Sequence, residues 1–123
     1  MRAQVLRTQA AIERAPLRLE ERAVPAPGLG EILVRVTACG VCRTDLHIVE
    51  GDLPLVRSPI GPGHQVVGRV ERSGPGASRF APSERVGIAW LRRTCGACAF
   101  CASGRENLCE KSEFTGWHAD GGF

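Results

Sequence analysis

The sequence predicts a mainly β fold: a small, Gly-rich antiparallel barrel or sandwich with a cysteine-bearing loop inserted near its end. Apolar residues alternate with other residues over short segments, which is the period-two pattern of strands. The 123 residues also include 15 Gly and 8 Pro, which leaves little room for long helices. A chain of this length forms one domain, because it cannot build two well-formed cores.

The expected elements follow one another along the chain. Ile32, Val34 and Val36 alternate with Leu33, Arg35 and Thr37, and the same alternation occurs around Val86 and Trp90. The segments with strand character are residues 1–6, 16–22, 32–37, 64–72 and 86–91. Stretches rich in Pro and Gly separate them at residues 25–30, 59–63 and 73–78, where turns are expected. Residues 44–49 predict one short helix, and no internal repeat is found.

Charge and hydropathy exclude several classes of partner. The net charge is +3, and the basic residues, all Arg except Lys111, are scattered from Arg2 to Arg105. A nucleic-acid surface needs them clustered, so no nucleic-acid partner is expected. No apolar run approaches a membrane span, and the charges in residues 1–19 do not suit a signal peptide. We therefore expect a cytoplasmic protein with no membrane partner.

Four of the six cysteines lie in a loop at about residues 91–113, spaced as C-x2-C-x2-C-x7-C. In a reducing cytosol, clustered cysteines are metal ligands or redox groups more often than disulfides. Four thiolates can surround one zinc ion, and such a closed site is structural. An iron–sulfur cluster and a set of free thiols are the alternatives; the missing Cys-Pro and the seven-residue gap disfavour the cluster. The expected structural zinc ligands are Cys95, Cys98, Cys101 and Cys109.

A second constellation consists of Cys42 and His64. A thiolate and an imidazole are both good zinc ligands. Taken alone, however, a cysteine is more often a small buried residue and a histidine more often a hydrogen-bonded one. Cys39 and Cys42 also form C-x2-C, which occurs in redox pairs, but no βαβ pattern surrounds them. The spacing of these residues alone does not decide whether they form a catalytic metal site.

Three ordered motifs reveal a family resemblance. GVCRTDLH from Gly40, GHQVVGRVE from Gly63 and the four-cysteine loop resemble the N-terminal catalytic domain of zinc-dependent alcohol dehydrogenases of the medium-chain dehydrogenase/reductase family. WLRRTCGAC from Trp90 and FTGWHADGGF from Phe114 are similar to the flanks of the family's zinc loop. The resemblance covers essentially the whole chain. It implies a GroES-like barrel, which agrees with the β pattern.

The resemblance also implies roles for individual residues. Cys42 and His64 match two of three catalytic zinc ligands, where open zinc favours loss of the alcohol proton before hydride leaves to a nicotinamide. Thr44 matches the hydroxyl that takes that proton, and His47 the relay that carries it to solvent. The remaining matches are Asp45, which would orient His64, and Arg43, which would face the cofactor pyrophosphate. Helix capping and simple solvation are the alternative readings of Thr44, Asp45 and Arg43.

For the substrate pocket and for the residues next to the predicted ligands, the resemblance implies less specific roles. Trp90 resembles a substrate-pocket aromatic of the fermentative branch and favours small primary alcohols only weakly, and Leu53 stands where that branch often has Trp. Gln65 replaces a common Glu beside the ligand histidine, which leaves the site less negatively charged. Cys39 is expected to be a packing residue and not a metal ligand. Trp117 and His118 are expected to be structural or surface residues.

The chain ends at Phe123, before the family's third catalytic ligand, and contains no G-x-G-x-x-G. Residues 1–123 are therefore expected to be the N-terminal part of a GroES-like catalytic domain whose barrel is incomplete and whose nucleotide-binding Rossmann domain is absent. The complete enzyme would oxidise an alcohol to an aldehyde or ketone with NAD or NADP, carry one structural and one catalytic zinc, and form a homo-oligomer. This fragment alone is expected to be inactive. A stand-alone structural zinc module and an iron–sulfur protein are the alternatives.

Overall fold

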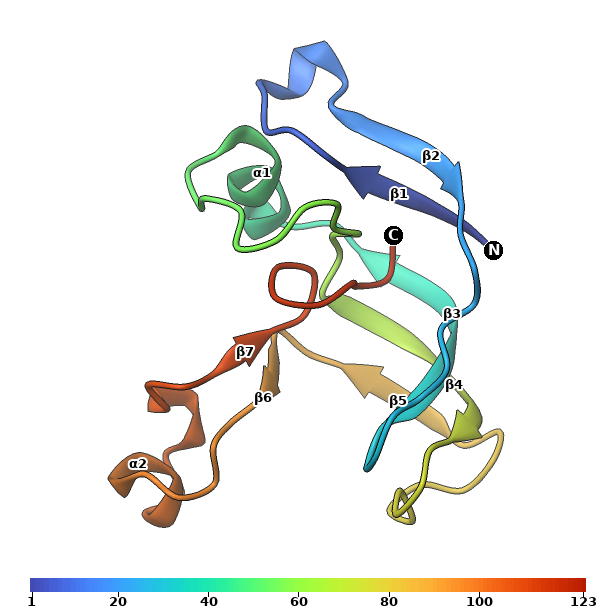
Figure 1. The fold of residues 1–123 in the computed structure, drawn as a ribbon, viewed down its shortest axis with the longest axis vertical. Coiled ribbons are helices and arrows are strands. Elements are labelled where there is room, and N and C mark those ends of the chain that lie inside the picture. The colour runs from blue at the N-terminus through green and yellow to red at the C-terminus, as the bar shows by residue number, and fades with distance from the viewer.

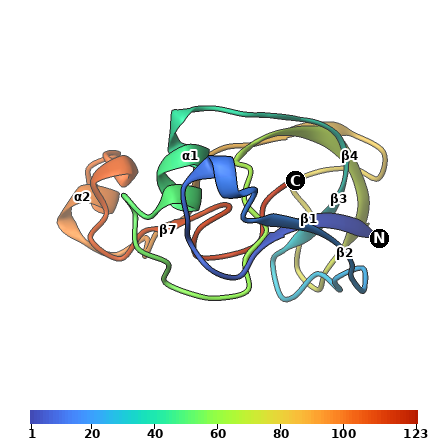
Figure 2. The same cartoon turned by 90° about the horizontal axis from the view of Figure 1, so that it is seen from above.

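The computed structural model describes all of residues 1–123 and has a mainly β architecture, which confirms the predicted fold class. Its strands form three small antiparallel sheets, ordered β1-β2, β3-β4-β5 and β6-β7, that do not close into one continuous barrel. A loop carrying the short helix α2 (Ala99–Ala102) projects from the body of the molecule (Figures 1 and 2). No helix is both long and apolar enough to cross a membrane.

The first sheet is a hairpin of β1 (Arg2–Leu6) and β2 (Leu17–Glu21). The short 3-10 helix η1 (Ile12–Arg14) lies in its connection. An isolated bridge between Leu6 and Ile60 joins the hairpin to the chain that leads to the second sheet. Gln4 also donates a 3.1 Å hydrogen bond from its amide to the carbonyl of Phe123, so the two ends of the chain lie side by side.

The second sheet contains β3 (Ile32–Gly40), β4 (Gln65–Ser73) and β5 (Arg85–Ile88). On β4, which lies over the predicted strand at residues 64–72, the residues Val66, Gly68 and Val70 are buried and alternate with more exposed ones. On β3 the alternation is not clean, because two register shifts against β4 rotate successive side chains away from a single face. Its residues 35–38 are all exposed.

The predicted strand over residues 86–91 is divided. Strand β5 ends at Ile88, and β6 (Leu91–Arg93) pairs instead with β7 (Glu113–Phe114). At the break, Thr115 donates from its hydroxyl to the carbonyl of Ala89 at 2.9 Å and from its amide to the carbonyl of Trp90 at 2.9 Å. These bonds replace ladder pairing, so two strands form where one was expected. The cysteine loop connects β6 and β7.

Helix α1 (Arg43–Glu50) supplies half of the central core cluster, which corresponds to the short helix predicted from the sequence. Two of its side chains are buried together with two from the hairpin and the loop before β4; the cluster is Leu6, Ile48, Val49 and Ile60. Only 17 of the 123 residues are buried. The core cluster therefore lies where the hairpin, the loop before β4 and the helix that follows Cys42 meet.

Candidate metal centres and active site

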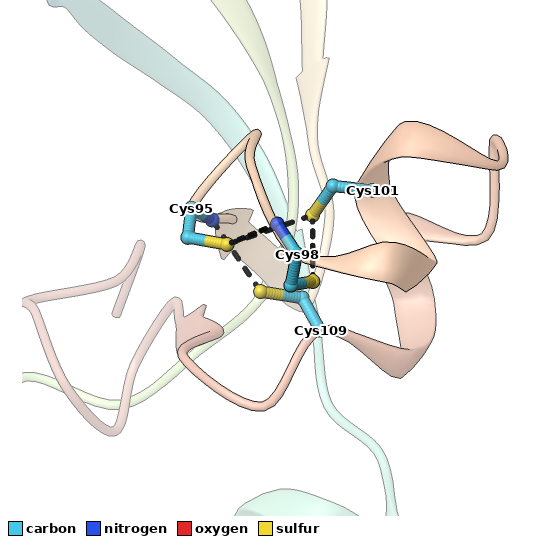
Figure 3. A group of neighbouring side chains, drawn as sticks. All are labelled: Cys95, Cys98, Cys101 and Cys109. Carbon is cyan, nitrogen blue, oxygen red and sulfur yellow. Dashed lines mark hydrogen bonds between the residues drawn. The ribbon is translucent and has the colours of Figure 1, made fainter.

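Two groups of metal-ligating side chains are present in the structure. In the first, the sulfur atoms of Cys95, Cys98, Cys101 and Cys109 converge from different turns of the projecting loop (Figure 3). All four sulfurs lie within 4.8 Å of one another, and the Sγ atoms of Cys98 and Cys101 are 3.5 Å apart. Four thiolates bonded to one zinc at about 2.3 Å would lie about 3.8 Å from each other. The donor set and spacing fit a single tetrahedral ion.

The backbone of the loop supports ionised sulfur. The amides of Ala97 and Cys98 donate to Cys95 Sγ at 3.5 Å and 3.3 Å, and these bonds lower the pKa of Cys95 to about 6. Desolvation, together with hydrogen bonding between the thiols of Cys101 and Cys98, raises the pKa of Cys101 to about 11. One thiol of the cluster therefore ionises readily and another resists ionisation. A cation bound among the four sulfurs would favour the ionised form of each.

The second group lies where α1 begins and β4 begins. Cys42 precedes α1 and His64 precedes β4, and their Sγ and Nε2 atoms are 3.2 Å apart. On the other side of the imidazole, Nδ1 of His64 lies 3.3 Å from Oδ1 of Asp45. The side chains of His64 and Asp45 are 6% and 3% exposed. A buried imidazole thus has a thiol at one nitrogen and a carboxylate at the other.

Local backbone structure explains this arrangement. Asp45 is the third residue of α1, and its Oδ2 accepts a 2.8 Å hydrogen bond from the amide of Cys42. A carboxylate at this position satisfies an otherwise unpaired amide at the start of a helix. Gly63, with φ of 95°, turns the chain just before His64, and a Cβ there would lie 2.8 Å from Cys39 Sγ. Both ligand candidates are therefore placed by backbone constraints.

The second group also fits a zinc ion. Thiolate and imidazole are zinc ligands, and a carboxylate behind the other nitrogen of the histidine is the usual partner of a metal-bound histidine. His64 Nδ1 and Asp45 Oδ1 are buried, and at 3.3 Å they are not aligned as a hydrogen bond. If Nδ1 carries the ring proton toward Asp45, Nε2 is free to bind a metal beside Cys42. This chain therefore contains two candidate direct ligands of the set that the resemblance implies.

The other residues singled out from the sequence lie around this group. Thr44 and Arg43 occupy the first turn of α1, half-buried and exposed respectively. His47 lies further along the same helix, and its ring is 35% exposed. Trp90 contacts the His64 ring edge-on, with centroids 4.9 Å apart. Leu53 packs against the central core cluster, as Trp90 does.

Trp90 belongs to a cluster of ring side chains that the sequence did not predict. Phe114 stacks on Trp90 at 4.7 Å, and Trp117 lies parallel to it at 6.1 Å. His118 packs against Trp117, and its Nδ1 accepts a 3.2 Å hydrogen bond from the Phe114 amide. These residues follow the cysteine loop in sequence, so no periodic pattern could link them to Trp90. The Trp117 indole donates to the carbonyl of Pro54 at 2.9 Å, next to Leu53.

Some predicted residues lie outside both groups. The Cys39 thiol is not a member of either cluster, and desolvation by burial raises its pKa. Gln65 begins β4 opposite Gly40 and is exposed. Asp52, which the sequence did not single out, contacts His47; only the chain reversal after α1 brings the two together.

Comparison with known proteins gives consistent matches. The family described as "Alcohol dehydrogenase GroES-like domain" matches residues 28–123. A probable alcohol dehydrogenase, AdhA, of Mycobacterium tuberculosis is 50% identical over 128 residues, covering 100% of this chain and 37% of the relative. An alcohol dehydrogenase of Geobacillus stearothermophilus is 46% identical, covering 89% of this chain and 33% of its own length.

Solved structures agree. The cobalt- and zinc-bound thermostable alcohol dehydrogenase from Pyrobaculum aerophilum matches with a TM-score of 0.90 and 33% identity, over 99% of this chain and 36% of that one. An NAD-dependent alcohol dehydrogenase matches with a TM-score of 0.88 and 33% identity, over 98% of this chain and 35% of that one. The chain thus spans about a third of the length of the relatives that it matches.

Proposed function

This chain belongs to the alcohol dehydrogenase GroES-like domain family, and we propose that it forms the metal-binding part of a zinc-dependent alcohol dehydrogenase. The reaction is oxidation of an alcohol to an aldehyde or ketone with hydride transfer to NAD or NADP. The observation that carries the proposal is the Cys42–His64–Asp45 group at the start of α1, in which His64 and Asp45 are buried. The relatives' names support the alcohol as substrate class.

Cys42 and His64 would hold the catalytic zinc, and Asp45 would hold the His64 ring in the required orientation. When bound, zinc supplies Lewis-acid polarisation of the alcohol oxygen, and the nicotinamide accepts the hydride. Within this chain, the Thr44 hydroxyl takes the alcohol proton and His47 passes it to solvent. The 35% exposure of the His47 ring supports such an exit to water.

Two further sets of residues complete the proposal. Arg43, exposed at the first position of α1, would pair with the cofactor pyrophosphate, for which a guanidinium fork is well suited. Trp90 and Leu53 would line the alcohol pocket, since Trp90 contacts His64 and both border the same core cluster. The four-cysteine loop would hold the second, structural zinc.

The test is alcohol oxidation by the zinc-loaded full-length gene product, measured as NADH or NADPH formation with primary and secondary alcohols. Cys42→Ser and His64→Ala should abolish turnover and remove one zinc per chain. Cys39→Ser is the matched control, because that thiol lies outside both clusters and should leave turnover and zinc content unchanged. A wild-type protein that binds zinc at both sites and oxidises none of these alcohols would overturn the proposal.

A structural zinc module is the second candidate, favoured by the compactness of the four-sulfur cluster within one loop. It predicts one tightly bound zinc that Cys95→Ser removes, with no turnover. The same preparations distinguish the two. Iron bound in place of zinc, measured after purification without oxygen, would instead indicate an iron–sulfur protein.

A further inference from the structure

Asp52 lies directly after α1 and has no part in the functions described above. Its Oδ2 is 2.6 Å from Nδ1 of His47, which is a short, charge-assisted contact. The carboxylate is 64% exposed and the histidine ring 35% exposed. Asp52 is thus the acidic group that touches the predicted proton relay.

The backbone fixes this contact. Gly51 ends α1 with φ of 106°, a left-handed conformation that glycine adopts without strain. The amide of Gly51 donates to the His47 carbonyl at 3.2 Å, and the amide of Leu53 donates to the same carbonyl at 3.0 Å. Asp52 lies between these two anchored amides, so the turn holds its carboxylate beside the histidine that accepts both bonds.

We propose that Asp52 is a positioning residue for His47. Its carboxylate accepts a hydrogen bond from Nδ1–H, which fixes the tautomer and the ring orientation and leaves Nε2 as the nitrogen that accepts a proton. In histidine the partner of one ring nitrogen decides the state of the other. The inference rests on the proposed function, in which His47 receives the proton that leaves the alcohol.

The proton balance is simple. As the alcohol O–H bond breaks, its proton passes by way of the Thr44 hydroxyl to Nε2 of His47, where an N–H bond forms. The ring becomes an imidazolium, and the Asp52 carboxylate opposes its positive charge until the proton leaves to water. Hydride leaves the carbon separately to the nicotinamide, so no additional oxidant is needed.

Other charged groups near α1 do not make this contact. Arg43 lies one helical turn before His47, and Glu50 accepts a hydrogen bond from the amide of Ile12 at 3.1 Å. Glu13 and Arg14 belong to η1, which packs against α1. None of these four forms an ion pair with His47, whereas Asp52 does. Glu50 therefore offers a matched control for removal of one negative charge at the end of the helix.

The first measurement is the tautomer of His47, read from the 15N shifts of its ring nitrogens in the zinc-loaded full-length gene product at a pH where the ring is neutral. The His47 signals are assigned by their loss in His47→Gln. We expect the Nδ1–H tautomer in the wild type and in Asp52→Asn, whose amide oxygen can still accept. Asp52→Ala should lose this preference and Glu50→Ala should keep it. An unchanged tautomer in Asp52→Ala would overturn the inference.

The second measurement is steady-state alcohol oxidation by the same proteins. Asp52→Ala should lower kcat by roughly 3- to 10-fold, which is less than the loss expected when a general base is removed altogether. KM and zinc content should not change. An active wild type whose kcat is the same in Asp52→Ala would overturn the inference. A wild type without alcohol oxidation would overturn the proposed function instead, and the tautomer would still decide whether Asp52 positions His47.

Discussion

The buried pair of Asp45 and His64 shows how single residues constrain the chemistry of this chain. Burying a carboxylate and an imidazole without full hydrogen bonding costs free energy. Both Asp45 Oδ1 and His64 Nδ1 are buried without a hydrogen-bond partner, although they lie 3.3 Å apart. Metal binding at Nε2 would offset this cost, because it would strengthen the attraction between the ring and the carboxylate. The pair therefore supports the proposed metal site.

Asp45→Asn tests this explanation. The amide keeps the size of the side chain but loses its negative charge, so the affinity for the zinc at Cys42 and His64 should fall about 10- to 100-fold. Competition with a chromophoric chelator measures the affinity. Glu50→Gln removes a carboxylate from the exposed end of the same helix and should change little. An affinity equal to that of the wild type in Asp45→Asn would show that the carboxylate does not support the metal.

Thr115 is a second residue with a definite energetic role. Its side chain is 2% exposed, and its hydroxyl donates to the Ala89 carbonyl where β5 and β6 separate. Thr115→Val should lower the free energy of unfolding by about 1 kcal/mol, because that hydrogen bond is lost with no change in size. Urea denaturation measures the change. Thr37→Val, at an exposed position of β3, is the control; equal stabilities of the two variants would contradict the prediction.

The sequence predicted individual site residues to different extents. The four loop cysteines lie close together in the sequence, so their spacing alone predicted the cluster. Cys42 and His64 are 22 residues apart, so their residue types suggested a pair but only the family resemblance implied a catalytic zinc site. The contact of Asp52 with His47 was not predicted, because it depends on the left-handed turn at Gly51. Contacts created by a chain reversal leave no periodic signal in a sequence.

At the scale of elements, local sequence patterns predicted which helices and strands are present better than they predicted where each one begins and ends. The hairpin strands, β3, β4 and α1 all overlap segments that were predicted from the sequence, although β3, β4 and α1 extend beyond the predicted bounds. The pattern over residues 86–91 predicted one strand, but the structure has two, since Thr115 binds the carbonyls at the break. Alternation reports which side chains face the interior, and it does not identify the partner strand. The pairing of β6 with β7 could therefore not be predicted from the sequence.

We expect the order of the cysteine loop to depend on a bound metal. Neither α2 nor η2 (Glu106–Leu108) contains a buried residue, so apolar packing contributes little to this segment. Cys98→Ser should remove about one zinc per chain and make the loop mobile. Trypsin should then cleave after Arg105, which is exposed between α2 and η2, much faster than in the wild type.

The matched control for this experiment is Cys39→Ser, which removes a thiol outside the loop. It should retain the wild-type zinc content and rate of cleavage after Arg105. Mass spectrometry identifies the cleavage site and metal analysis counts the zinc. Equal cleavage rates in Cys98→Ser and the wild type would mean that the loop is ordered without metal.

At the scale of the whole molecule, the small core is the dominant feature. A cluster of Leu6, Ile48, Val49 and Ile60 connects the hairpin, α1 and the loop before β4. Large apolar side chains remain exposed elsewhere, among them Leu29 at 84%, Val41 at 73% and Val36 at 43%. In the β3-β4-β5 sheet, β3 and β5 are the outer strands. Exposed edges and apolar side chains together favour association with further protein surface.

We therefore expect residues 1–123, produced by themselves, to form oligomers. The unpaired edges of β3 and β5 offer backbone amide and carbonyl groups to another copy of the chain. Val36 in β3 and Val41 just after it are exposed and add apolar area. Light scattering coupled to size exclusion measures the mass across a concentration series. Val36→Lys places a charge on an outer strand and should reduce association without touching the core cluster. A monomeric wild type with one cooperative unfolding transition would contradict this expectation, because it would mean that the three small sheets are stable without added partners.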